Sequence, residues 1–312
     1  MKNNRRLWVV VEKLFNWLNI FAQRRGLILN YSVTEIPPAP RDSSEYKRAI
    51  DSAILIQGPI LYPKFLENVI NFYSAHYPRV PIILSTWKKD GNLKKLKNVN
   101  KVLLIENDPP IIPGIANINF QAVSTLSGLK LAKERNASHV LKIRSDQGLF
   151  ASNFLEQFMF SLAAAPTSRF KRIATTDFNS FLFRPNSPSD QIQFAETETL
   201  LDFWSAYSSD NLIEGSFPEE ILLIAYLSKL GIPNTRSLKS SLETYRDCFV
   251  FLDSTDLGLV WRKGSWRHPD SRFNQLNRSS LLRFVSPDEW RRLHVDLESV
   301  LVEAKALGIS NL

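Results

Sequence analysis

The sequence predicts an α/β fold built on a mostly parallel, doubly wound sheet of the Rossmann-like type. Short apolar segments of strand length alternate with segments of helical periodicity in the first half of the chain. Their order is strand, helix, strand, strand, helix, strand, and each strand ends at polar residues. This alternation is typical of parallel sheets with helices on both faces. We therefore expect the polar residues to lie along one edge of the sheet.

Each predicted element has a local reason. Four apolar runs are predicted to be buried strands, at 52–56, 81–84, 102–105 and 140–143. Helical spacing occurs over 65–75, and again where Ala122, Leu126 and Leu129 share one face at i, i+4 and i+7. Further along we expect helices at 153–164, 197–207 and 218–230, and short strands near Ile173 and at 181–183. Pro218 and Gly231 are ordinary signals for the start and end of a helix.

Polar side chains follow each of the first four strands. The segments are Gln-Gly-Pro at 57–59, Ser-Thr-Trp at 85–87, Glu-Asn-Asp-Pro at 106–109 and Arg-Ser-Asp at 144–146. In an open α/β sheet, ligands bind outside the carboxyl ends of the strands. Asp146 is therefore placed to hold a divalent cation against a diphosphate, as a nucleotide-sugar transferase requires. A single strand-terminal aspartate also has a simpler interpretation, which is a residue that caps a loop.

Five sequence blocks occur in a fixed order between residues 51 and 150. They are IQGPI at 56–60, ILSTW at 83–87, NDP at 107–109, the segment 117–129 with NINFQ, ST and GL, and KIRSD at 142–146. This set resembles the WavE family of lipopolysaccharide-synthesis proteins. The resemblance is looser over Ser189-Asp190 and 218–220. The chain departs from the family pattern at Phe120, at Gln191-Ile192 and at Glu220, and these departures bear on the acceptor more than on the fold.

The resemblance implies a glycosyltransferase of the A-type fold, with the donor nucleotide over the first strands and an acidic metal-binding triplet after the fourth. Residues 144–146 stand in that place, which implies Asp146 as a ligand of Mn²⁺ or Mg²⁺ and Arg144 near a phosphate. Because only the last position is acidic, nucleotide phosphates must complete the metal site. We expect Gln57, Asp108 and Asp146 to converge on one cleft. The residues expected at the nucleotide are Gln57, Gly58, Pro59, Thr86, Asp108, Asn119, Gln121 and Arg144.

Two carboxylates are candidates for a catalytic base. An inverting transfer needs a carboxylate within hydrogen-bonding reach of the acceptor hydroxyl, because that proton leaves as the new bond forms. The resemblance implies an acid at the start of a helix that faces the acceptor, which favours Glu219. Asp190, in a Ser- and Pro-containing loop, is the competing candidate. Acids are also ordinary residues in a first helical turn, so Glu219 has a structural alternative.

The segment 261–270 mixes aromatic, basic and small residues around His268. Guanidinium groups bind phosphate oxygens, and neutral histidine binds metals. The resemblance implies that a late histidine reaches the metal, so His268 is expected to partner Asp146. A solvated basic loop would explain the same composition.

Length, cysteine content and charge limit the function classes. With 312 residues and 44% hydrophobic content, the chain can bury a large core in one α/β domain with appended helices. The single cysteine, Cys248, excludes an internal disulfide and favours a reducing, cytoplasmic location. The net charge of +8 comes without a helix-turn-helix or RNA-binding signature, so nucleic-acid binding is not expected.

Residues 1–30 differ from the rest of the chain in charge and periodicity. They carry six basic residues against one acid, Glu12. Polar residues at 12, 16, 19 and 23 fall on one stripe of a helix that is otherwise apolar, which predicts an amphipathic helix in an anionic membrane surface. The alternative is a helix packed on the catalytic domain. No run is long enough to span a membrane, and the apolar run is too short for a secretion signal.

These observations predict domain boundaries and a function. We expect the amphipathic helix at 1–30, a Pro-containing linker at 31–50, a glycosyltransferase-like domain at 51–275 and a C-terminal helical segment at 276–312. The expected function is metal-dependent transfer of a hexosyl-type sugar from a nucleotide sugar to a lipid-linked or envelope saccharide, on the cytoplasmic face of the inner membrane.

Two other functions stay open at this point. One is a non-catalytic module of the same fold that binds nucleotide sugars or glycans. The other is a sugar nucleotidyltransferase, which would be expected to carry a Gly-rich basic loop after the first strand. Residues 58–61 do not supply such a loop.

Overall fold

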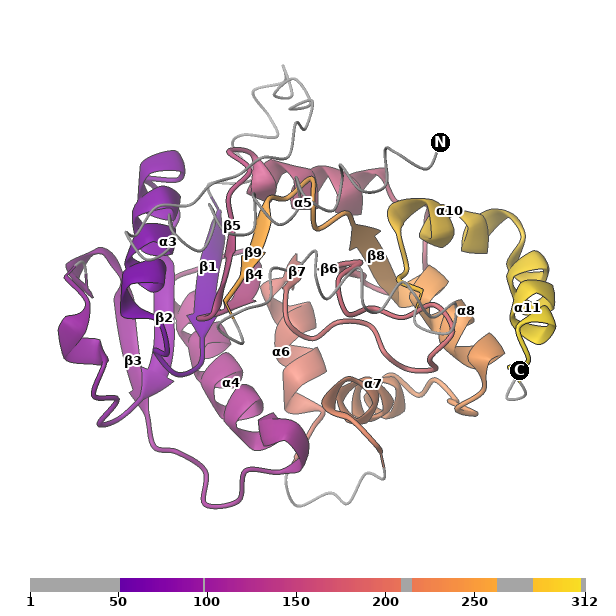
Figure 1. Cartoon of the computed structure of the whole chain (residues 1–312), viewed down its shortest axis with the longest axis horizontal. Coiled ribbons are helices and arrows are strands. Elements are labelled where there is room, and N and C mark those ends of the chain that lie inside the picture. The colour runs from indigo at the N-terminus through magenta and orange to yellow at the C-terminus, as the bar shows by residue number, and fades with distance from the viewer. Residues whose placement is uncertain (1–50, 98, 209–214, 263–282, 310–312) are drawn as a thin grey trace, which may run out of the picture.

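The computed structural model describes residues 51–97, 99–208, 215–262 and 283–309 (Figure 1). The strands are β1 (Ser52–Gln57), β2 (Ile82–Trp87), β3 (Leu103–Asn107), β4 (His139–Arg144), β5 (Gln147–Leu149), β6 (Ile173–Thr176), β7 (Gln193–Glu196), β8 (Phe249–Leu252) and β9 (Leu259–Trp261). The helices are α3 (Pro63–His76), α4 (Ile118–Glu134), α5 (Phe154–Ala164), α6 (Thr197–Ser205), α7 (Pro218–Lys229), α8 (Leu238–Cys248), α10 (Pro287–Val295) and α11 (Leu297–Ala306). Short 3-10 turns lie at Leu93–Lys95, Val99–Lys101 and Ile115–Asn117. The predicted helix at 1–30, the linker at 31–50 and His268 lie outside the described residues.

A seven-stranded sheet in the order β3-β2-β1-β4-β7-β6-β8 forms the centre of the fold, and β5 pairs with β9 in a second sheet. Strands β1 to β4 are parallel, and β6 is parallel to β8. Within the seven-stranded sheet, only β7 runs antiparallel to its neighbours, β4 and β6. The carboxyl ends of the six other strands therefore share one edge. This arrangement confirms the predicted α/β fold with a mostly parallel, doubly wound sheet.

The predicted order of the first half is confirmed element by element, from β1 through α3, β2, β3 and α4 to β4. Strand β1 lies between β2 and β4, and all six of its residues are buried. A central parallel strand is covered on both faces, which is why its sequence is a continuous apolar run rather than an alternating one.

Helices cover both faces of the sheet (Figure 1). The chain steps from β1 through α3 to β2 and β3, and then returns through α4 to β4 on the other side of β1. Right-handed crossovers in opposite directions place α3 and α4 on opposite faces. Helix α3 packs on α5, with ring centroids of Tyr73 and Phe154 4.9 Å apart, while α4 contacts α6. The strand order therefore reverses between β1 and β4.

The close approach of α4 to β1 depends on Gly128. A Cβ at this position would lie 2.1 Å from a methyl carbon of Leu55, so no larger residue fits without a shift. Ala122 and Leu129 are buried on the same helix, and Leu126 is partly buried against the core. The helical face predicted from the sequence is thus the face that packs on the sheet.

In the second half, α5, α6 and α7 confirm the three predicted helices, with Pro218 at the start of α7 and Gly231 at φ 68° beyond its end. The strand predicted at 181–183 is wrong. Phe181 forms a single bridge with Phe284, and the surrounding loop closes on itself through a hydrogen bond of 2.7 Å from Ser187 Oγ to the Arg184 carbonyl. Strands β5, β7, β8 and β9 have three or four residues each, too few to show a period in the sequence.

Two helices, α10 and α11, occupy most of the described residues between 283 and 309. Ser286 caps α10 by accepting a hydrogen bond from the Glu289 amide. The buried Trp290 donates to the Tyr245 carbonyl at 3.1 Å and ties α10 to α8. In the part of the chain that the structure describes, no helix combines the length and the apolar character needed to cross a bilayer.

Candidate functional site

Two loops meet at the point where the strand order reverses, between β1 and β4. Gln57 and Arg144, the last residues of these strands, are partners in the sheet register. Beyond them the Ser145 amide donates to the Gln57 carbonyl at 2.9 Å, and the Ser145 hydroxyl donates to the Pro59 carbonyl at 2.6 Å. Gly58 has φ 111°, a conformation that favours glycine. The result is a fixed edge at the switch point, where open α/β sheets bind ligands.

Three residues predicted to bind the nucleotide lie near this edge, but their side chains are buried or hydrogen-bonded within the protein. Gln57 Oε1 accepts from the Ser124 hydroxyl at 2.8 Å. Asn119 is buried in the first turn of α4, and its Oδ1 accepts from the Tyr207 hydroxyl. Gln121 Oε1 is buried and has no hydrogen-bond partner. Of these three, only Gln121 has a buried oxygen left to bind a ligand.

Thr86 is the last residue but one of β2, and Asp108 directly follows β3; the two side chains have different surroundings. Thr86 is buried, with its hydroxyl 3.4 Å from a carboxylate oxygen of Asp90. Asp108 is 79% exposed at its side chain and pairs with Lys88 at 2.7 Å. The structure therefore does not bring the carboxylate of Asp108 to the buried groups at the end of β4.

Asp146 forms a two-pronged ion pair with Arg144. Nε and Nη2 of Arg144 donate to the two carboxylate oxygens of Asp146, each at 2.9 Å, and Trp261 Nε1 donates to Oδ2 at 3.2 Å. The Asp146 side chain is 3% exposed, whereas that of Arg144 is 21% exposed. Burial opposes the charged form of Arg144, but the hydrogen bonds and the charge of Asp146 outweigh it and raise the pKa of Arg144.

The described residues do not fit a divalent metal at Asp146. Mg²⁺ and Mn²⁺ need several oxygen ligands, but both oxygens of Asp146 already accept N–H donors. Among the described residues, no three His, Cys, Asp or Glu side chains gather to hold a metal. His268, the implied partner, lies outside them. The role of Asp146 as a metal ligand stays a prediction.

A buried lysine holds the segment that carries Asp190. Lys142 is fully buried in β4, and its Nζ donates to the Asp190 carbonyl and lies 4.7 Å from the centre of the Trp204 ring. Burial is the largest influence and lowers the pKa of Lys142 to about 8, although the charge of Asp190 opposes the shift. Lys142 thereby fixes the backbone just before β7 against the end of β4.

The two candidate bases lie within the electrostatic range of the same cations. The charges of Asp190 and Glu219, together with that of Asp146, act on both Lys142 and Arg144. We call these five residues the strand-end cluster. Glu219 belongs to the first turn of α7 and is half-buried, whereas Asp190 is buried. The charges of Asp146, Asp190 and Glu219 thus all act on Arg144, and the roles predicted for these residues stay predictions.

Several buried polar side-chain atoms in or beside β5, β6 and β7 have no hydrogen-bond partner. They are Asp190 Oδ2, Gln147 Oε1, Thr176 Oγ1 and both amide atoms of Asn179. Gln147 directly follows Asp146, and its Nε2 donates to Gln191 Oε1 at 2.6 Å. Buried polar atoms are normally paired, because an unpaired one costs free energy. Atoms of this kind are suited to accept or donate hydrogen bonds to a bound polar ligand.

Two buried charged residues were not singled out by sequence reasoning. Asp177 follows β6, and burial together with the charge of Asp253 raises the pKa of its carboxyl to about 7. The signal was the same as for Asp146, an acid directly after a strand. Lys142 lies in one of the five blocks, and a lysine inside an apolar strand was the available signal for it.

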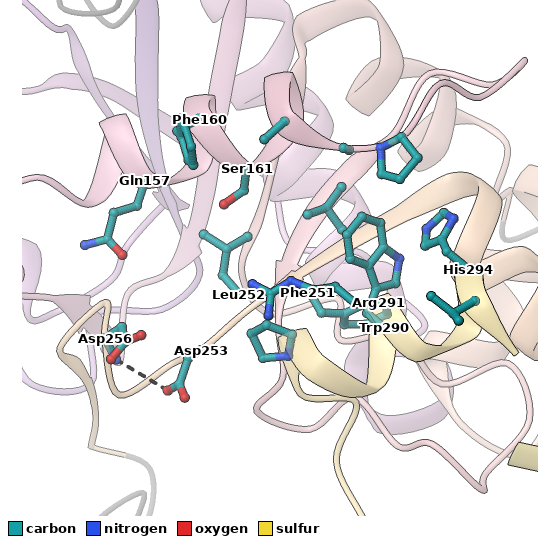
Figure 2. Close-up of a pocket in the computed structure, with 16 residues that line it drawn as sticks. Gln157, Phe160, Ser161, Phe251, Leu252, Asp253, Asp256, Trp290, Arg291 and His294 are labelled. Carbon is teal, nitrogen blue, oxygen red and sulfur yellow. Dashed lines mark hydrogen bonds between the residues drawn. The ribbon is translucent and has the colours of Figure 1, made fainter. Parts of the chain in front are cut away.

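The described residues also line a hollow of about 490 Å³ between α5, β8 and α10 (Figure 2). Its wall is mostly apolar and includes Phe160 and Trp290, with Asp253 and Asp256 at one end and His294 at the other. We call it the α5–β8–α10 cavity. None of the site residues predicted from the sequence lines it.

Comparison with known proteins identifies the family. The WavE lipopolysaccharide synthesis family matches residues 52–216, more than half of the chain, and the chain belongs to this family. A search among curated proteins finds no match.

Among solved structures, a cytidylyltransferase from Leptospira borgpetersenii is similar at 15% identity and a TM-score of 0.39, over 84% of this chain and 98% of that one. A nucleotidyl transferase from Methanothermobacter thermautotroptrophicus is similar at 13% identity and a TM-score of 0.37, over 57% of this chain and 82% of that one. Neither TM-score reaches 0.5, and we draw no functional conclusion from them.

Proposed function

We propose that this WavE-family chain is a glycosyltransferase that moves a sugar from a nucleotide-sugar donor to a saccharide or glycolipid acceptor of the cell envelope. The family description supports a place in lipopolysaccharide synthesis. The observation that carries the proposal is the strand-end cluster, in which two cations and three carboxylates gather at the switch point of the sheet. Open α/β sheets bind nucleotides at such a point.

The cations suit the leaving group of this reaction. When the bond between the anomeric carbon and the diphosphate breaks, its electron pair stays on the diphosphate, which leaves as nucleoside diphosphate. Arg144 presents a guanidinium at the partly exposed end of the cluster. A fixed cation that faces the developing negative charge lowers the barrier more in a buried site than in water.

The carboxylates suit the other half of the reaction. The acceptor hydroxyl oxygen attacks the anomeric carbon, and its proton passes to a carboxylate. Glu219 is half-buried at the start of α7 and can meet an acceptor from outside. Asp190 is buried with one unpaired oxygen, which suits a hydroxyl of the bound donor sugar. We therefore assign the base to Glu219 and sugar binding to Asp190.

A donor screen tests the proposal. Purified protein is incubated with UDP-, GDP-, dTDP-, ADP- and CMP-linked sugars and a lipopolysaccharide-core acceptor, and release of free nucleotide is measured with added Mn²⁺ or with EDTA. Acceptor-dependent release of nucleotide from one donor supports a glycosyltransferase. Saturable binding without release would instead favour the non-catalytic module. Release of pyrophosphate from a nucleoside triphosphate and a sugar 1-phosphate would identify a nucleotidyltransferase.

We also propose that residues 1–30 attach the enzyme to an anionic membrane surface, where a glycolipid acceptor resides. The support is the charge of this segment, six basic residues against one acid. Deletion of residues 1–30 should abolish cosedimentation with phosphatidylglycerol-containing vesicles and leave nucleotide binding intact. Unchanged vesicle binding after the deletion would show that attachment lies elsewhere.

A further inference from the structure

The geometry points to a donor site that neutralises the diphosphate with the Arg144 guanidinium in place of a divalent metal, with Asp146 as the residue that positions it. This inference rests on the proposed function. It gives Asp146 the Arg144 guanidinium as its partner, whereas the family resemblance implies a metal ion. The argument begins with the hydrogen-bonding capacity of the two side chains.

Both oxygens of the Asp146 carboxylate already accept N–H donors. Oδ1 accepts from Arg144 Nε, and Oδ2 accepts from both Arg144 Nη2 and Trp261 Nε1. The Arg262 amide also donates to the Asp146 backbone carbonyl at 2.8 Å, so the strand end is held from a segment more than a hundred residues away. A metal at this carboxylate would have to displace charged donors from a side chain that is 3% exposed.

The guanidinium of Arg144 has donors to spare. A guanidinium carries five N–H groups. The two hydrogen bonds to Asp146 leave three N–H groups, on the side of the group away from the carboxylate. The Arg144 side chain is 21% exposed while that of Asp146 is 3% exposed, so Arg144 is the member of the pair that a ligand can reach. The planar fork of a guanidinium matches the geometry of two phosphate oxygens.

The cluster as a whole does not attract an anion. Three carboxylates and two cations act on one another in it, so it carries a small net negative charge before a ligand binds, and a bound diphosphate needs a further cation. A second guanidinium, that of Arg262, lies 5.4 Å from the ring centre of Tyr62 in the loop that follows β1. The two arginines approach the switch point from β4 and from β9. Together they offer two guanidinium groups to the phosphate oxygens in place of a cation from solution.

The test compares nucleotide-sugar binding with and without metal. Each donor of the UDP-, GDP-, dTDP-, ADP- and CMP-sugar panel is titrated calorimetrically into protein stripped with EDTA and into protein supplied with Mn²⁺, and Mn²⁺ alone is titrated as well. We expect one donor to bind with the same affinity in both conditions, and we expect no saturable Mn²⁺ site. Binding that appears only with Mn²⁺ would overturn this inference and leave the proposed function standing. No binding of any donor in either condition would overturn both.

Variants separate the roles of the two residues. Arg144→Gln should weaken donor binding about 10- to 100-fold, the usual range for lost charge-assisted hydrogen bonds. The double variant Arg144→Gln with Asp146→Asn leaves no unpaired buried charge and should fold, as checked by circular dichroism, yet show the same loss. Arg246→Gln is the matched control, because Arg246 forms the same two-pronged pair with Asp247 on α8. Donor binding in the double variant as strong as in the parent would overturn the inference.

Discussion

The strand-end cluster and the α5–β8–α10 cavity are both places for a ligand, and they differ in what gathers there. The cavity has a volume of about 490 Å³ and a mostly apolar wall, with Val295 86% exposed at its rim. The cluster concentrates five charged side chains, of which Lys142, Asp146 and Asp190 are buried. Burying charge is costly, and folds retain it where it serves chemistry. On this comparison we place the proposed site at the concentration of charge rather than at the larger hollow.

The two regions also treat their acids differently. In the cluster, Asp146 forms an ion pair with the guanidinium of Arg144. Beside the cavity, Asp177 and Asp256 lie near Asp253, and burial with this like charge raises the pKa of both. The pKa of Asp177 reaches about 7, so its carboxyl holds a proton over much of the acidic range. The acid Asp146 of the cluster lies beside a cation, whereas burial and a like charge favour the neutral form of Asp177 and Asp256.

The largest expected effect is on sugar transfer. Glu219→Gln should reduce the transfer rate about 10²- to 10⁴-fold, or roughly 3 to 5 kcal/mol in the transition state, because general-base catalysis contributes that much. Donor affinity should stay nearly unchanged. The measurement is single-turnover transfer from the donor found in the screen, together with calorimetric binding.

Glu220→Gln is the matched control for this prediction, because Glu220 lies in the same helical turn and its Oε2 accepts from the Ser216 amide. It should transfer sugar at close to the parent rate. Asp190→Asn separates the two assigned roles, since it should weaken donor binding as well as transfer. If both amide variants of Glu219 and Asp190 transferred at the parent rate, neither would be the base.

The next effect is on folding stability and concerns the buried ion pair. Asp146→Ala leaves Arg144 without its counter-charge and should lower the free energy of unfolding by about 3 to 5 kcal/mol. The surface pair of Arg246 and Asp247 has the same geometry, but Asp247→Ala should cost only about 0 to 1 kcal/mol. Urea denaturation of the three proteins measures both values. Equal losses of unfolding free energy in the two variants would show that burial does not strengthen the ion pair of Arg144 and Asp146.

A third expected effect is a pH dependence of the free energy of unfolding, which comes from Asp177. The folded-state pKa of Asp177, about 7, lies above its unfolded value, so the folded protein binds the proton more tightly. This contribution is fully present below about pH 4 and is lost as the pH rises through about 7, by an amount on the order of a few kcal/mol. Asp177→Asn should flatten that part of the stability profile, as measured by denaturation at about pH 5 and about pH 8. An unchanged profile would assign the pH dependence to other groups.

The smallest effect is expected at the rim of the cavity. Val295→Ser replaces an exposed residue and should change the free energy of unfolding by no more than about 0.5 kcal/mol. Donor binding and transfer should match those of the parent protein. A large loss of transfer in this variant would mean that the cavity takes part in the reaction, and the comparison above would have to be reversed.

Much of the fold could be predicted because its first half is built from local signals. The continuous apolar run of β1 reflects burial on both faces, and Gly128 and Leu129 lie on the face of α4 that packs on the sheet. Short strands such as β7 could not be predicted, since four residues show no period and their conformation depends on their neighbours in the sheet.

The candidate site was predicted in part for a related reason. A position after a strand places a residue at the carboxyl edge, and this held for Asp146 and Asp108 alike. The position after a strand does not predict the direction in which the side chain points. Asp146 is turned inward by Arg144 and by Trp261, which is 115 residues away, whereas Asp108 points outward to Lys88. Periodicity contains no information about such partners.

By itself, the sequence determined the class of fold and the edge of the sheet at which polar residues gather. Both depend on hydrophobic periodicity and on the handedness of crossovers, which are properties of short segments. Only the tertiary structure decided that β7 enters antiparallel between β4 and β6, so that Lys142 holds the Asp190 backbone, and that Trp261 closes over Asp146. These contacts join segments that are far apart in the chain, and such pairings are selected by the packing of the whole core rather than by any local pattern.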